Sequence, residues 1–180
     1  MATAPLPSGP IEIRVARIEQ LFESLDPSPF HERDLDREAA DYIAGWAGDL
    51  PEAAALRIVI HLPADEVQRP EAGQIAGAVS HHFGYLALTT ERALRELFRV
   101  GRHYLAIGVV ILGLCLVGSQ LVRTHFGEGP VASVMRESLI ILGWVSNWKP
   151  LETFLYDWWP VRRRLRLLRR LAAAPVDVGV

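Results

Sequence analysis

The histidines are the side chains of this sequence that most readily suggest metal binding or acid–base chemistry. The 180-residue chain contains six of them. His81 and His82 are adjacent in a segment with helical periodicity, so their side chains point about 100° apart and cannot easily hold one ion. Neither His-x-x-x-His nor His-Glu-x-x-His occurs. We therefore predict no metal site and no cofactor, and we expect structural or interface roles for these two histidines.

The acidic pair Asp65 and Glu66 is a second candidate, because it follows His61 at the end of a predicted strand. Proteins with α/β folds often place functional groups at strand ends. The dipole of a starting helix also favours acidic residues, and we prefer this second interpretation. The single cysteine, Cys115, has no base near it in the sequence, and no glycine-rich phosphate loop is present. We predict that the protein is not an enzyme.

A run of aromatic and basic residues near the C-terminus suggests lipid binding. Tryptophan prefers the headgroup level of a bilayer, and each arginine near an anionic surface contributes about 1 kcal/mol of attraction. An apolar segment comes immediately before the run, so we predict contact with anionic lipid and not with nucleic acid. The residues expected to contact lipid are Trp148, Trp158, Trp159, Arg162, Arg163, Arg164, Arg166, Arg169 and Arg170.

Charge divides the chain into two halves. Residues 1–91 contain 6 Arg and 15 Asp or Glu, and residues 92–180 contain 12 Arg, 1 Lys and 6 Asp or Glu. The first half is therefore acidic and the second basic, although the whole chain has a net charge of only -2. A length of 180 residues allows one ordinary domain with little left for a second.

Residues 104–122 predict a first membrane crossing. This stretch contains no Asp, Glu, Lys, Arg or His. As a helix it would be about 28 Å long, close to the roughly 30 Å hydrocarbon core of a bilayer. The residues before it are too few to enclose a helix that is apolar on every side. Gly108, Gly113 and Gly118 recur every five residues, a spacing that we do not interpret as a close-packing stripe.

A second apolar stretch, residues 131–148, is interrupted by Arg136 and Glu137 near its beginning, where long side chains can reach the membrane surface. We predict a second crossing at about residues 134–155, with a helix lying in the membrane surface as the alternative. Arginines lie before the first crossing and after the second, whereas the loop 123–133 contains only Arg123. The positive-inside rule then places both termini in the cytoplasm and the loop outside.

The acidic half predicts a small cytoplasmic α/β domain with about two strands. Residues 11–16 alternate between apolar and polar, and residues 56–62 form an apolar run that a proline ends. Segments with helical periodicity lie between and after them, and Asp34 or Asp36 is expected to cap the helix that contains Tyr42 and Trp46. A two-stranded sheet is marginal alone, so we expect a second copy or a partner chain to complete it.

The sequence therefore predicts a mainly α membrane protein, a transmembrane hairpin preceded by this α/β domain. Residues 1–10 are a proline-rich stretch without the basic and apolar regions of a signal peptide, and we expect a flexible tail. The domain covers residues 11–91 and the hairpin residues 92–160. Residues 161–180 alternate arginine with leucine and predict a basic amphipathic helix on the inner leaflet.

The block from Trp148 to Pro160 with the arginines after it, together with residues 25–36, resembles a family of uncharacterised bacterial inner-membrane proteins with two membrane segments. The resemblance spans nearly the whole chain. It implies a bacterial source, an inner-membrane location and two crossings. It implies no activity, cofactor or site residue.

These features predict a non-catalytic, membrane-anchored interaction protein, either an oligomeric scaffold or an accessory subunit of a larger membrane assembly. Its expected partners are anionic lipid and either itself or another membrane protein. One alternative is a small oligomeric transporter or channel component in which Arg136 and Glu137 line the path. Another is a membrane-tethered enzyme that uses residues of two pairs, namely Asp65, Glu66, His81 and His82.

Overall fold

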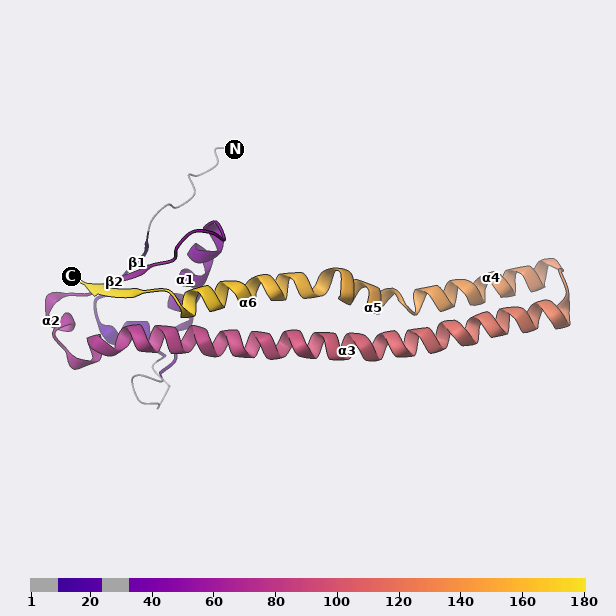
Figure 1. Ribbon diagram of the computed structural model, residues 1–180, viewed down its shortest axis with the longest axis horizontal. Helices are drawn as coiled ribbons and strands as arrows, with labels where there is room; N and C mark the ends of the chain where they lie inside the picture. Colours follow the sequence, from indigo (N-terminus) through magenta and orange to yellow (C-terminus); the bar gives the residue numbers. More distant parts are fainter. Residues whose placement is uncertain (1–9, 24–32) are drawn as a thin grey trace, which may run out of the picture. The chain divides into compact units, whose positions relative to one another are not determined.

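The computed structural model describes residues 10–23 and 33–180, which form two compact units. The first unit combines the described residues up to Thr90 with residues 163–180, and the second unit is residues 91–162 (Figure 1). Nearly all of the predicted tail, residues 1–9, lies outside the described residues. Because the C-terminal residues belong to the first unit, they are not the separate segment that the sequence predicted.

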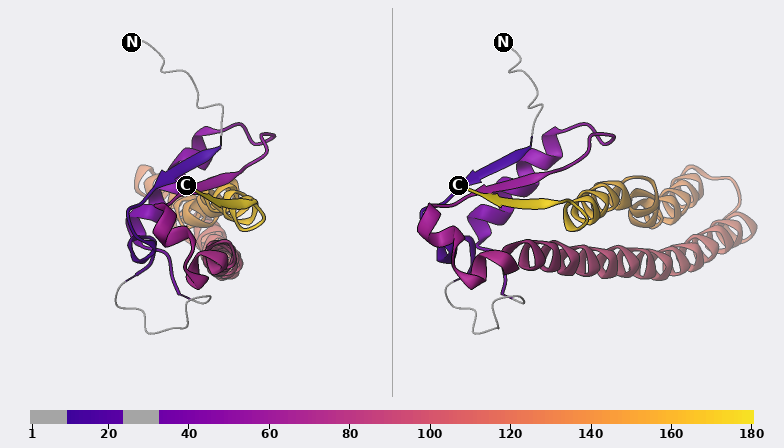
Figure 2. Two further views of the ribbon diagram at one scale, coloured as in Figure 1. Left: turned by 90° about the vertical axis from the view of Figure 1, so that its left-hand side faces the viewer. Right: turned by 60° about the vertical axis from the view of Figure 1, so that its left-hand side comes forward.

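Three parallel strands form the sheet of the first unit, in the order β1-β2-β3. They are β1 (Ile11–Arg14), β2 (Ile58–His61) and β3 (Val176–Gly179). Ile11 pairs with Ile58, which also pairs with Val176. Figure 2 shows the yellow C-terminal strand beside the strands from the N-terminal part of the chain. The expectation of about two strands is therefore wrong, because the chain itself supplies the third.

The two faces of the sheet differ in polarity, as the alternation along each strand requires. On one face Ile11, Ile58 and Ile60 are completely buried. On the other face the side chains of Glu12 and Asp177 are exposed. The sheet thus has one face in the core of the unit and one polar face in solvent.

Helix α1 (Arg37–Asp49) connects β1 to β2, after the short 3-10 helix η1 (Ile18–Leu21). The Asp36 carboxylate accepts hydrogen bonds from the backbone N–H groups of Glu38 and Ala39, at 2.9 and 3.4 Å. This is the N-cap that the sequence predicted at Asp34 or Asp36. The inner face of α1 is buried through Ala40, Ile43 and Ala47.

Two long helices complete the core of the first unit. After α2 (Ala64–Val67) and η3 (Pro70–Gln74), α3 runs from Ile75 to Phe126. Its first turns bury Ile75, Val79 and Phe83 completely. Helix α6 (Trp158–Ala172) buries three leucines that lie three residues apart, namely Leu165, Leu168 and Leu171.

The leucine face of α6 is therefore buried inside the domain, whereas contact of this helix with the inner leaflet stays a prediction. An amphipathic pattern shows that one face is covered, but the covering surface here is protein. Two arginines of the same helix also bind the domain. The Arg170 guanidinium donates to the carbonyl oxygens of Ala54 and Pro51, at 2.8 and 3.2 Å, and Arg166 contacts Glu52 at 3.0 Å.

The connection from β2 to β3 contains the whole second unit. Parallel strands need a crossover connection, usually through a helix. Here the crossover leaves β2 at His61, passes through α3, residues 91–162 and α6, and returns at Val176. The second unit is thus an insertion in the second crossover of a β-α-β-α-β domain.

We expect residues 1–90 alone to remain unfolded, because they lack β3 and the α6 leucines. Residues 1–90 joined to residues 163–180 by a Gly/Ser linker of about 15 residues, with an r.m.s. span of about 20 Å, should fold. Circular dichroism and urea unfolding distinguish the two proteins. Leu171→Asp in the joined protein is the control and should abolish its cooperative transition, because Leu171 is completely buried. A cooperative transition for residues 1–90 alone would contradict this account of the domain.

Candidate functional site: an apolar helical hairpin

The second unit is a helical hairpin whose turn is encoded by two glycines and a proline. Helix α3 ends at Phe126 and α4 (Pro130–Val145) begins four residues later. Gly127 has φ +68°, the left-handed conformation that commonly ends a helix and that glycine adopts without strain. Gly129 is the N-cap of α4 and Pro130 is its first residue, where a proline lacks only a donor that has no helical partner.

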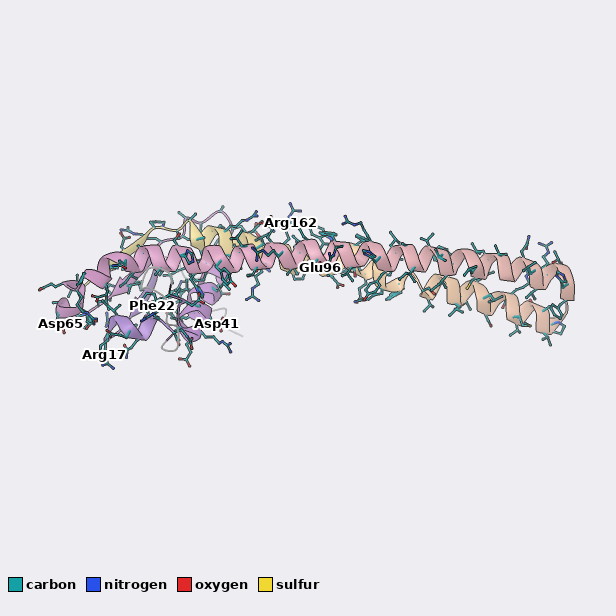
Figure 3. All side chains as sticks on the ribbon, turned by 90° about the horizontal axis from the view of Figure 1, so that it is seen from below. Arg17, Phe22, Asp41, Asp65, Glu96 and Arg162 are labelled. Carbon is teal, nitrogen blue, oxygen red and sulfur yellow. The ribbon has the colours of Figure 1, made fainter. Side chains whose placement is uncertain are left out.

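One helix of the described residues, Pro70–Phe126, is long and apolar enough to cross a membrane. The predicted first crossing, residues 104–122, lies within this helix. Only 17% of the most apolar 18-residue stretch of the helix is buried, and side chains such as Val110, Leu114 and Val117 are at least 60% exposed. A soluble protein rarely leaves so long an apolar surface uncovered. Figure 3 shows the side chains projecting outward along the hairpin.

The return arm is not one continuous α-helix. Helix α4 has 16 residues, about 24 Å of length, and α5 (Trp148–Glu152) follows after a break at Ser146 and Asn147. A π-helical turn, η4 (Thr153–Asp157), then leads into α6. The predicted second crossing, 134–155, therefore contains α4 from Val134 onward, this break, α5 and the start of η4.

Small residues bring the two arms close together. On Gly143, an added Cβ atom would lie 2.8 Å from Leu112 Cδ1 and 3.2 Å from Cys115 Cβ. On Gly108 it would lie 2.7 Å from Asn147 Oδ1. No side chain fits at either position without movement of the other arm. We call eight buried residues of the hairpin the seam: Gly101, Gly108, Cys115, Ser119, Val122, Ala132, Gly143 and Asn147.

The seam on α3 follows a seven-residue spacing. Gly101, Gly108, Cys115 and Val122 are each seven residues apart, the repeat that keeps one stripe facing a partner helix. The five-residue spacing of Gly108, Gly113 and Gly118 does not follow this stripe. Gly113 indeed faces open space, but Gly108 lies in the seam. The signal was the heptad spacing of small residues of several types, not of glycine alone.

Asn147 links the arms through hydrogen bonds. It is buried, and its Nδ2 donates to the carbonyl oxygens of Gly108 and Gly143, at 3.1 and 3.0 Å. Hydrogen bonds between membrane helices contribute about 0.6 kcal/mol on average and up to about 2 kcal/mol. The Gly108 carbonyl is reachable because that residue has no side chain. Asn147 thus ties the break in the return arm to α3.

Arg136 lies on the inner side of the return arm, whereas Glu137 is exposed. The Nε atom of Arg136 is buried and has no hydrogen-bond partner among the described residues. The two adjacent charges therefore do not form one paired site, as their neighbouring positions on a helix require.

An aromatic cluster lies where the return arm meets α6. The ring of Phe98 lies 6.1 Å from Phe154 and 6.5 Å from Trp158, and the Trp158 indole donates to the Phe154 carbonyl at 2.9 Å. The Arg162 guanidinium lies 5.6 Å from the centre of a Trp158 ring, a cation–π distance.

The residues predicted to contact lipid do not form one surface. Trp148 and Trp159 are 72% and 65% exposed, as lipid contact would need, and Arg163 and Arg164 are exposed too. Trp158 and Arg162 contact each other, whereas Arg166 and Arg170 bind the domain. Arg169 is also exposed and has a contact of its own. Lipid contact stays a prediction for these residues.

The acidic and histidine candidates divide into exposed and structural groups. Asp65 and His81 are exposed. Glu66 is buried and accepts a hydrogen bond from the Ile18 backbone N–H at 2.9 Å, while the His82 Nδ1 lies 2.9 Å from an Asp34 carboxylate oxygen. These contacts hold backbone segments in place. The described residues contain no group of three or more His, Cys, Asp or Glu that could hold a metal ion.

Arg69 is the centre of an ion-pair cluster near these candidates. It contacts Glu19 at 2.7 Å, Glu66 at 3.2 Å and Glu71 at 3.5 Å. The hydrogen bond from Arg69 lowers the pKa of the Glu19 carboxyl group. The cluster fixes η1 to the loop after α2, and its charges are used within the fold.

Comparison of the chain with protein-family models, with curated proteins and with solved structures finds no match. The resemblance to inner-membrane proteins therefore stays a prediction.

Gly143→Leu should force the arms apart, because a side chain there meets Leu112 and Cys115. Overpacking of this kind costs about 1–3 kcal/mol. The chain has one cysteine, which is buried in the seam, so the rate of Cys115 alkylation by a maleimide in mild detergent reports the opening. We expect faster alkylation in Gly143→Leu. Gly113→Leu, at a position with open space around it, is the matched control, and an equal increase there would show that the seam does not set the packing.

Proposed function

We propose that the protein is a membrane-anchored interaction protein whose hairpin crosses a bilayer twice and holds the three-stranded domain at the cytoplasmic surface. The observation that carries this proposal is the pairing of β2 with β3 on opposite sides of the inserted hairpin in the sequence.

Sheet pairing constrains the number of crossings. Strands that share hydrogen bonds lie in the same compartment, so the segment between β2 and β3 must cross a membrane an even number of times. If α3 crosses once, the return arm must cross back. Residues 130–152 of that arm span about 34 Å as a helix, enough for a hydrocarbon core of about 30 Å. Asn147 supports the break within it, because non-helical backbone at membrane depth is tolerated where protein covers it.

The outer surface of the hairpin supports a lipid environment. Both arms expose large apolar side chains, among them Leu114, Ile141 and Trp144, whereas Gly108, Gly143 and Asn147 face the seam. This is the distribution expected for membrane helices, in which lipid surrounds the apolar side chains and small residues allow close helix contact. The arginines at the open end of the hairpin and the single Arg123 near its turn favour a cytoplasmic domain.

The polar face of the sheet supports an interaction role. Parallel sheets occur almost only with both faces covered, yet in this chain one face is exposed around the half-buried Val59 of the central strand. A second copy of the chain, or another membrane protein that this chain serves as an accessory subunit, would cover it. The proposal thus keeps both the scaffold and the accessory-subunit role.

A small oligomeric transporter or channel component is the second candidate. Arg136 favours it, because ionisable residues within a membrane segment often mark an ion or proton path, and the Nε of Arg136 is buried without a partner among the described residues. Flux of ions into liposomes that contain the purified chain tests this candidate directly.

Membrane topology tests the anchoring. Glu128→Cys and Asp177→Cys, each in a Cys115→Ser background, place a single thiol in the loop between the arms and in β3. An impermeant maleimide should label position 128 in intact cells, and position 177 only after the membrane is permeabilised. The protein should also stay in the membrane fraction at alkaline pH. Labelling of position 177 in intact cells would contradict the cytoplasmic domain.

A photo-crosslinking residue at Val59 tests the partner surface. We expect adducts in native membranes, because the polar face of the sheet is where a covering protein would lie, and their masses identify a second copy or another protein. The same residue at Tyr42, exposed on α1, is the control and should give fewer adducts. Adducts at Tyr42 but none at Val59 would move the interface away from the sheet.

A further inference from the structure

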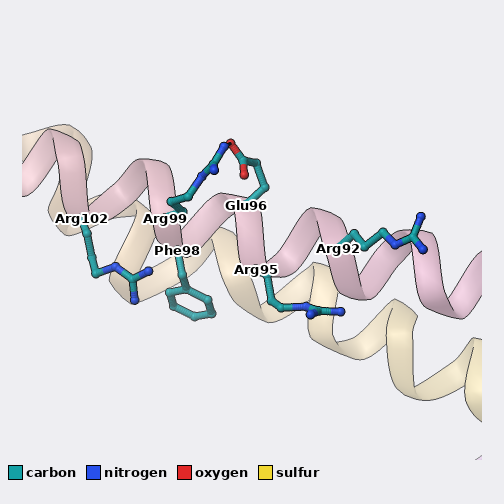
Figure 4. Close-up of a pocket in the computed structure, with 6 residues that line it drawn as sticks. All are labelled: Arg92, Arg95, Glu96, Phe98, Arg99 and Arg102. Carbon is teal, nitrogen blue, oxygen red and sulfur yellow. Dashed lines mark hydrogen bonds and ion pairs between the residues drawn. The ribbon is translucent and has the colours of Figure 1, made fainter.

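A shallow groove of about 590 Å³ lies on the second unit, where α3 approaches its apolar stretch (Figure 4). Four arginines, one glutamate and one phenylalanine line it. They are Arg92, Arg95, Glu96, Phe98, Arg99 and Arg102. None of the lipid contacts expected from the sequence is among them.

Two of these arginines carry charge that no described residue neutralises. Arg99 is paired with Glu96 at 2.8 Å, whereas Arg95 lies 3.8 Å from Glu91, too far for a hydrogen bond. Arg92 and Arg102 have no ion pair or hydrogen bond with any side chain in residues 10–23 and 33–180. Among these residues, the groove is therefore a cationic surface with unused donors.

The arginines are arranged around an aromatic side chain. Arg95, Phe98 and Arg102 are three and four residues apart and share one face of α3, and Figure 4 shows their side chains on the same side of the helix. Phe98 belongs to the aromatic cluster with Phe154 and Trp158. The cationic Arg95 and Arg102 thus lie on either side of Phe98 along this face of the helix.

The groove also borders the apolar surface. Arg102 is two residues before Tyr104, where the charge-free stretch begins, and Leu105 and Ile107 beyond it are exposed. A ligand here would place an anionic group among arginines and an apolar group along the hairpin. Arginine binds phosphate through two parallel hydrogen bonds. A phospholipid has both an anionic phosphate group and apolar chains.

We propose that this groove binds the phosphate headgroup of an anionic phospholipid, held between Arg95 and Arg102 with its acyl chains along the exposed face of α3. The proposal rests on the membrane-spanning hairpin proposed above. Nucleic acid or an acidic protein would use the arginines but would gain nothing from the apolar surface beside them. Arg166 and Arg170 of the C-terminal run bind the domain, so the strongest lipid contact lies on α3 and not on α6.

Lipid exchange on the full-length protein tests the site. The purified chain in mild detergent is titrated with phosphatidylglycerol and with phosphatidylcholine, and native mass spectrometry counts the bound lipids. The double variant Arg95→Gln/Arg102→Gln should lose its preference for phosphatidylglycerol by about 30-fold, the effect of two arginines at a membrane surface. Arg163→Gln/Arg164→Gln removes the same charge from exposed positions and should keep most of the preference.

Folding and anchoring are measured in parallel. Slow alkylation of Cys115 shows that the double variant keeps its hairpin. An equal loss of preference in the two double variants, or no preference in the wild type, overturns the groove. The proposal is also overturned if the double variant Arg95→Gln/Arg102→Gln loses co-purified RNA or an acidic protein while its phosphatidylglycerol binding is unchanged. If the wild-type chain leaves the membrane fraction at alkaline pH, the proposed membrane anchor is wrong. If the chain stays there but shows no lipid preference, only the proposed headgroup site is wrong.

Discussion

The pairing of Ile58 with Val176 is the contact on which the rest of this structure depends. It joins two parts of the chain that are separated by the whole hairpin. A parallel pair of this separation has a high entropic cost, so the domain must compensate with buried surface, which α3 and α6 provide. The pairing also makes the domain a single sheet, and it fixes both ends of the insertion to one unit.

The close packing of the hairpin depends on a different feature, namely glycines at the contact between its two arms. Gly108 and Gly143 let the backbones approach, and Asn147 uses that approach to reach a carbonyl oxygen on the facing arm. Lipid tails are as apolar as leucine, so membrane helices gain little from apolar burial and associate through close packing and hydrogen bonds. In the proposed bilayer, lipid surrounds the outward-facing Val110, Leu114 and Val117 of α3, whereas the earlier turns of this helix point Ile75 and Phe83 into a core.

Arginine has three distinct roles in this chain, and position along the helices separates them. Arg69 fixes a loop through acidic partners, and Arg166 and Arg170 hold α6 to residues 51–54. Arg92 and Arg102 keep their charge free among the described residues, beside the apolar surface. Basic residues in a sequence therefore have the same charge but several functions. Only the neighbours of each guanidinium distinguish these functions.

The sequence by itself determined the apolar span within α3, the two strands β1 and β2, and the cap of α1, because each depends on residues close in the chain. Charge-free length, period-two alternation and an aspartate before a helix are local signals. Only the tertiary structure decided the third strand, the partner of the α6 leucines and the members of the seam. Strand β3 offers only Val176 and Val178 as apolar residues, whereas the patterns around β1 and β2 extend over residues 11–16 and 56–62. The apolar face of a helix indicates that something covers it, but it does not indicate which surface does so. Small residues likewise become an interface only when a second helix lies against them, because close approach is a property of the pair.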